Sequence, residues 1–109
     1  MKKKKTTNPA AGLDGGQLRV KLSSTVARAL HRRPGWFVLR VSARLHHQLS
    51  DEAARRENAA GLPAGGVPLG VLAASLLEEA NHARELHTYR TAAERCRRAL
   101  AVRLAQLAP

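Results

Sequence analysis

The chain has few aromatic residues, few acids and a single cysteine. Its three aromatics, Trp36, Phe37 and Tyr89, would make a poor stacking platform for single-stranded nucleic acid. The lone Cys96 cannot form an intramolecular disulfide, which excludes a disulfide-rich secreted scaffold and favours a reducing cytoplasm. No apolar run approaches the roughly 20 residues of a membrane-spanning helix, so we expect no membrane insertion.

No catalytic or metal-binding cluster is recognisable in the sequence. His46 and His47 are adjacent and would point to different sides of a helix. His82 and His87 are five residues apart, whereas ligands on one helical face are three or four residues apart. Residues 61–66 are glycine-rich but lack the following Lys-Ser or Lys-Thr of a nucleotide site. We therefore expect no enzymatic activity, no metal and no cofactor.

Positive charge is concentrated in the first half of the chain. Residues 1–56 contain thirteen of the nineteen Lys and Arg residues and three of the eight acids, which gives a net charge of +10. The remainder is nearly neutral at +1. Charge gathered in one region creates a directed electrostatic field, and the expected partner is a polyanion, most often nucleic acid. We expect double-stranded DNA as the partner. The expected location is the cytoplasm, in association with the nucleoid.

The N-terminal region predicts a tail followed by a short strand. Residues 1–17 combine a Lys run with Gly and Pro, which predicts a disordered basic tail that either solubilises the chain or contacts phosphates. Residues 18–22 alternate apolar and basic side chains, as a strand does, or could lead into a helix. Ser23 can cap a short helical stretch that ends at Pro34-Gly35.

Residues 36–41 give the strongest strand signal, because they are rich in β-branched and aromatic residues. Ser42 can then cap a helix that runs to Asn58, with Leu45 and Leu49 at four-residue spacing. Residues 58–68 contain three Gly and two Pro and predict a loop.

An apolar stripe with three- and four-residue steps runs from Leu69 to Leu107. One helix of that length would be roughly 60 Å long, so the stripe is either broken near residues 81–87 or forms a coiled-coil-like dimer element. Cys96 falls on this stripe, where a small buried hydrophobe is the default. The arginines of the last segment, Arg95, Arg97 and Arg98 among them, predict a solvated face, with phosphate contact as the alternative.

The predicted fold is mainly α with one or two short β-strands. We divide the chain into a disordered basic tail (1–17), a nucleic-acid-binding domain (18–84) and a C-terminal helical extension (85–109), which could also bind a protein partner. Ala- and Leu-rich helices with few aromatics pack thinly, so a second copy of the chain is expected to complete the core.

The order strand, helix, loop, helix resembles the ribbon-helix-helix family of DNA-binding dimers. The residues behind the resemblance are 37–41 as the ribbon, 42–58 as the first helix and 68–83 as the second. The resemblance implies that the ribbons of two chains pair antiparallel and enter the major groove, with the N-terminus of the second helix facing a phosphate. A lone strand also needs a neighbour for its backbone groups, which pairing with a symmetry mate would supply.

This arrangement assigns roles to three sets of residues. Arg40 is the expected reader of guanine, because arginine can bind that base bidentately. The expected base contacts are Arg40, Val38 and Trp36. The expected phosphate contacts are Lys2, Lys3, Lys4, Lys5, Arg19, Lys21, Arg32, Arg33 and Arg44. The expected dimer core is Phe37, Leu39, Val41, Leu45, Leu49, Leu72 and Leu76.

Alternatives remain open at this level. Residues 18–22 repeat the Leu-Arg-Val pattern of 39–41, so they could be the groove-reading strand or could pair with 37–41 inside one chain, which weakens the argument for a dimer. The expected function is a transcriptional repressor or a plasmid or phage accessory factor in partition or transfer. The alternatives are a basic component that docks on a ribonucleoprotein or other large assembly, and an interaction protein that uses its last helix.

Overall fold

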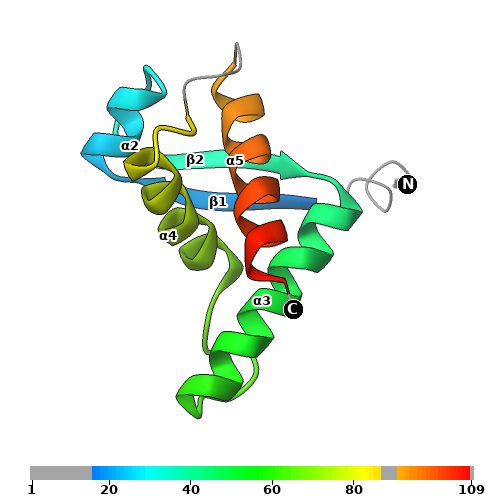
Figure 1. Ribbon diagram of the computed structural model, residues 1–109. Helices are drawn as coiled ribbons and strands as arrows, with labels where there is room; N and C mark the ends of the chain where they lie inside the picture. The colour runs from blue at the N-terminus through cyan, green and yellow to red at the C-terminus, as the bar shows by residue number, and fades with distance from the viewer. Residues whose placement is uncertain (1–15, 87–90, 109) are drawn as a thin grey trace, which may run out of the picture.

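The computed structural model describes residues 16–86 and 91–108, which form two strands and four helices (Figure 1). The elements are β1 (Gly16–Leu22), α2 (Ser24–Ala29), β2 (Gly35–Val41), α3 (Ala43–Ala60), α4 (Leu69–His82) and α5 (Ala92–Leu107). The prediction of a mainly helical chain with one or two short strands is therefore confirmed. β1 begins two residues earlier than the alternation at 18–22 suggested.

The two strands pair with each other inside one chain. β1 and β2 are antiparallel, with Leu22 opposite Gly35 at one end and Gly16 opposite Val41 at the other. The intramolecular alternative is thus confirmed. Residues 37–41 pair with β1 and not, as the resemblance implied, with the same strand of a second chain. The physical reason is the connection: residues 23–34 include a helix, α2, and are long enough to return the chain alongside β1.

The connection between the strands is built from local signals. Ser23 caps α2, its Oγ accepting a hydrogen bond from the amide of Val26 at 3.2 Å, as expected. After Leu30 the backbone of His31 enters the left-handed region with φ 58°, and Gly35 opens β2 with φ 123°. Gly35 suits this position because a side chain would be strained at that φ.

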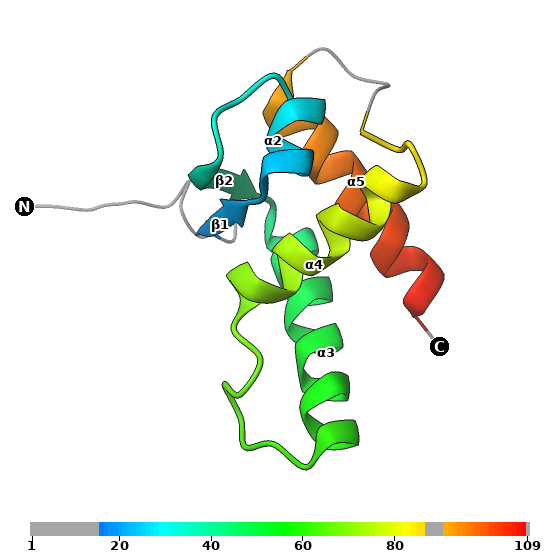
Figure 2. The same cartoon turned by 90° about the vertical axis from the view of Figure 1, so that its left-hand side faces the viewer.

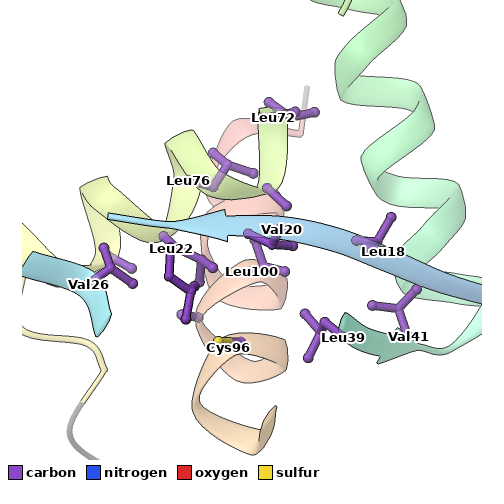
Figure 3. Packing of buried hydrophobic residues seen from close by; sticks show 14 of the residues in the cluster. Leu18, Val20, Leu22, Val26, Leu39, Val41, Leu72, Leu76, Cys96 and Leu100 are labelled. Carbon is purple, nitrogen blue, oxygen red and sulfur yellow. The ribbon is translucent and has the colours of Figure 1, made fainter. Parts of the chain in front are cut away.

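α4 and α5 cover one face of the sheet, and Figure 2 shows both on the same side of it, while α2 contacts β1 at the sheet's end. α4 packs on β1, and α5 packs on β2, α3 and α4. Figure 3 shows the result, with inward side chains of both strands meeting side chains of α4 and α5. The core includes Leu18, Val20, Leu22, Val26, Leu39, Val41, Leu72, Leu76, Cys96 and Leu100.

The residues expected to form a dimer core lie instead in this intramolecular core. Leu39, Val41, Leu45, Leu49, Leu72 and Leu76 are each at most 6% exposed within the single chain. Phe37 is half-buried, with the guanidinium of Arg32 5.4 Å from its ring centroid. One chain alone therefore covers these side chains, and the thin core that suggested a second copy is completed by α5.

The long apolar stripe is divided between two helices, which confirms the predicted break over the single long helix. α4 ends at His82 and α5 begins at Ala92, where the Oγ1 of Thr91 accepts a hydrogen bond from the amide of Glu94. Arg103 of α5 forms an ion pair with Glu85, in the turn after α4, at 3.1 Å and donates a hydrogen bond to the carbonyl oxygen of Glu79 in α4 at 3.3 Å. The segment expected as a C-terminal extension thus supplies one wall of the common core.

The loop after α3 is anchored by a buried carboxylate. Gly61 ends α3 in the left-handed conformation with φ 70°. The Oε2 of Glu57, which is 8% exposed, accepts hydrogen bonds from the amides of Gly65 at 3.0 Å and Val67 at 2.9 Å. These bonds satisfy a buried charge and position the start of α4.

Gly70 brings the first turn of α4 against the backbone of β1. A Cβ at this position would overlap with the carbonyl oxygen of Arg19. We expect Gly70→Ala to destabilise the protein by about 1–3 kcal/mol through overpacking, although Ala normally stabilises a helix interior by about 1 kcal/mol relative to Gly. Urea unfolding measures the change. Ser75→Ala, at an exposed position of the same helix, is the control, and a Gly70→Ala variant as stable as wild type would contradict this packing.

Candidate nucleic-acid interface

The face of the sheet opposite the helices carries six side chains that alternate with the buried ones. Because successive residues of a strand point to opposite faces, burial of Leu18, Val20 and Leu39 turns their neighbours outward. We call these six residues the outer face: Gln17, Arg19 and Lys21 from β1, and Trp36, Val38 and Arg40 from β2. All six are exposed, Trp36 at 63% and Val38 at 51%. The outer face contains three cations and no acid.

The strand register sets the spacing of the outer face. Lys21 lies opposite Trp36, and Gln17 lies opposite Arg40. At about 3.4 Å per residue, Trp36 and Arg40 are about 14 Å apart along β2. The guanidinium of Arg19 lies 4.8 Å from the ring centroid of Trp36, and the Nζ of Lys21 lies 6.0 Å from it. These cation–π contacts hold the basic side chains along the face.

Trp36 separates two grooves that are both lined by cations. The first, of about 400 Å³, lies between Trp36 and the start of α4, with Arg19 and Lys21 on its walls. The second, of about 410 Å³, lies between Trp36 and the turn after α2, where it is lined by His31, Arg32 and Arg33. The basic surface therefore continues past the end of the sheet on both sides of the indole.

No acid of the described residues belongs to the outer face, although Glu78 shares a groove with Lys21. Glu78 accepts a hydrogen bond from the Oγ of Ser23 at 2.6 Å. The others contact the following groups: Asp51 the imidazole of His47, Glu52 the guanidinium groups of Arg55 and Arg56, Glu57 the loop amides, Glu79 and Glu85 the guanidinium of Arg103, and Glu94 the hydroxyl of Thr91. No carboxylate on the outer face therefore offsets the positive charge of its three cations.

Glu52 illustrates how these acids serve the fold. Burial alone would raise the pKa of its carboxyl, but hydrogen bonds from Arg56 and Arg55 outweigh burial and hold the pKa below its ordinary value. The stability that this triad contributes is therefore present above the ordinary pKa and is lost as the pH falls through the lowered one.

The single cysteine, Cys96, lies in the core. Burial raises the pKa of the Cys96 thiol to about 11, with Arg97 and Arg32 acting in the opposite direction. The thiol is fully buried in the core, as its place on the apolar stripe predicted. Within residues 16–86 and 91–108, no group of three or more His, Cys, Asp or Glu side chains could hold a metal ion. In the same part of the chain, no helix is long and apolar enough to cross a bilayer.

The structure brings most of the predicted contact residues together. Trp36, Val38 and Arg40, expected to contact bases, share the outer face with Arg19 and Lys21, expected to contact phosphates. Arg32 and Arg33 adjoin this face at the second groove. Arg44 lies elsewhere, in a groove between α3 and α5. Lys2, Lys3, Lys4 and Lys5 lie outside the described residues.

Two contributions to the interface were missed by sequence reasoning. Gln17 extends the outer face by one position, which the alternation would have revealed if followed back from Arg19. Pro68 and Val71, at the start of α4, line the first groove; this contact depends on packing, and no local pattern indicates it.

No protein-family model matches the chain, and neither a curated protein nor a solved structure has significant similarity to it.

Proposed function

We propose that this protein binds duplex DNA by placing the outer face of its two-stranded sheet in the major groove. The observation that carries the proposal is a regular antiparallel ribbon whose exposed face has three cations, two apolar side chains and no acid. A major groove about 12 Å wide accepts a two-stranded ribbon. Both strands come from one chain, so the ribbon itself requires no second copy.

The outer face offers distinct groups for bases and for phosphates. Arg40 has the donor geometry for the O6 and N7 atoms of guanine, and Val38 and Trp36 offer apolar contact for thymine methyl groups. Arg32 and Arg33 lie at the other end of β2, where they can contact the backbone that borders the groove. The biological role we propose is a transcriptional repressor or a plasmid or phage accessory factor in partition or transfer.

A second candidate is a basic component that docks on a ribonucleoprotein. The observation that favours it is Trp36, an exposed indole between two cation-lined grooves, because aromatic side chains stack on unpaired bases. Competition between duplex DNA and single-stranded RNA of equal length separates the two candidates. The homodimer and the cytoplasmic, nucleoid-associated location remain predictions.

The test of the proposed function is sequence discrimination. A preferred duplex is first selected from a random pool, and its affinity is compared with that of an unrelated duplex. Arg40→Ala is expected to reduce the difference by about 1–3 kcal/mol, because it removes a base-edge contact. Arg33→Ala should weaken both duplexes equally, because a phosphate contact carries no sequence information. Equal weakening by Arg40→Ala would show that the ribbon does not read bases.

A further inference from the structure

A third basic groove, outside the outer face, lies between α3 and α5. It has a volume of about 510 Å³, and its walls carry three arginines, Arg44 from α3 and Arg97 and Arg98 from α5. No acid lines it. More than fifty residues of sequence separate Arg44 from the other two, so only the packing of α5 on α3 brings them together.

The helix geometry explains why the groove is open and polar. On α3, Arg44 and Gln48 are four residues apart and share one helical face. On α5, Ala101 and Ala105 continue the face of Arg97 and leave space because their side chains are small. Leu45 also lines the groove and is buried. The result is a groove with an apolar base and cationic walls.

The electrostatics of this groove favour an anion. Three guanidinium groups line one groove and make it positive, and an anion between them lowers their mutual repulsion. The groove also includes Ser42, the N-cap of the 18-residue helix α3, whose first turn contains no acid. The positive end of the helix dipole therefore adds to the field of the arginines.

The position of the groove links it to the outer face. A guanidinium nitrogen of Arg97 donates a hydrogen bond to the carbonyl oxygen of Arg40 at 3.3 Å. The groove thus begins where β2 ends, at the end of the outer face opposite to Trp36. Figure 1 shows the same arrangement, with α3 starting beside the end of β2 and α5 alongside.

We infer that the α3–α5 groove binds the phosphodiester backbone of the nucleic acid as it leaves the outer face at Arg40. This inference rests on the proposed function for its ligand, and it adds a second contact region whose residues, Arg44 and Arg98, read no bases. Arginine suits the role because its planar guanidinium binds phosphate oxygens bidentately.

The experiment uses the double variant Arg44→Gln/Arg98→Gln and leaves Arg97 in place, because Arg97 supports the carbonyl of Arg40. The matched control is Arg28→Gln/Arg84→Gln, which removes two exposed arginines outside the groove. Loss of two phosphate contacts should lower the slope of log affinity against log salt by about 1.8, so that the fall in affinity between 50 and 200 mM salt becomes about twelvefold smaller. The control should lower the slope of log affinity against log salt by less than the groove variant does.

Equal slopes for the groove variant and the control would overturn the inference. Titration of inorganic pyrophosphate, followed by calorimetry, supplies a second arm that does not depend on DNA. Saturable binding that the groove variant loses, while Arg19→Gln/Lys21→Gln retains it, supports the groove as a phosphate site even if duplex binding itself fails. Pyrophosphate binding without any change in the DNA slope would assign the groove to a free phosphate compound and overturn the backbone as ligand. Absence of both effects would also overturn it.

Discussion

Raising the salt concentration from 50 to 200 mM should lower the affinity of this protein for duplex DNA by about three orders of magnitude. The fall follows from counterion release, to which each phosphate contact contributes a slope of about 0.9, so that about six contacts give this change. Candidates among the described residues are Arg19, Lys21, Arg32 and Arg33 near the sheet, and Arg44 and Arg98 in the α3–α5 groove.

Fluorescence anisotropy with a labelled duplex at four or more salt concentrations measures the slope. Deleting Lys2 to Lys5 provides a control for the tail, because it should weaken all duplexes equally and reduce the slope further. An affinity that stays constant across this salt range would remove nucleic acid as the partner. A basic surface that docks by shape and apolar contact would give that result.

Leu76→Glu should abolish the fold. Leu76 is fully buried between α4 and the rest of the core (Figure 3), and a carboxylate placed there has no partner. The cost is several kcal/mol in addition to the lost apolar burial, which is comparable with the whole stability of a small domain, about 5–15 kcal/mol. Circular dichroism at 222 nm should show that most of the helix signal is lost.

The matched control is Val71→Glu, which places the same charge on the same helix at a side chain that is 63% exposed. It should keep the helix signal. In the unmutated protein, the unfolding midpoint should stay constant as protein concentration changes, because the strand pair and the core close within one chain. A midpoint that rises with concentration would contradict this expectation and show that folding is coupled to association with a second copy.

Local signals predicted much of the architecture. The alternation in 18–22 and the β-branched run in 36–41 predicted both strands and the side chains that point outward from the second. Ser42 was correctly identified as a helix cap, and its Oγ accepts the amide of Leu45 at 3.1 Å. Pro34-Gly35 marked the start of β2. Each of these features depends on residues close together in sequence, where steric and hydrogen-bonding preferences act directly.

Contacts between distant segments could not be predicted from these local signals. The partner of residues 37–41 could be β1 or a symmetry mate, because either one satisfies the same backbone groups. The α3–α5 groove depends on how α5 packs, which helical periodicity does not determine. Arg44 was predicted as a phosphate contact, and the packing of α5 places it apart from the sheet, with Arg97 and Arg98.

The sheet is completed during synthesis long before the helices that cover it. Leu18, Val20 and Leu22 of β1 pack against α4 and α5, and α5 ends at Leu107. At roughly 5–20 residues per second, a ribosome needs several seconds to add the missing helices. Throughout that time the nascent chain exposes an apolar surface back to back with a cationic one, a combination that chaperones bind and that promotes aggregation. Truncated products ending before residue 92 would lack α5 and leave β2 without its cover, so they should be insoluble fragments rather than smaller folded modules.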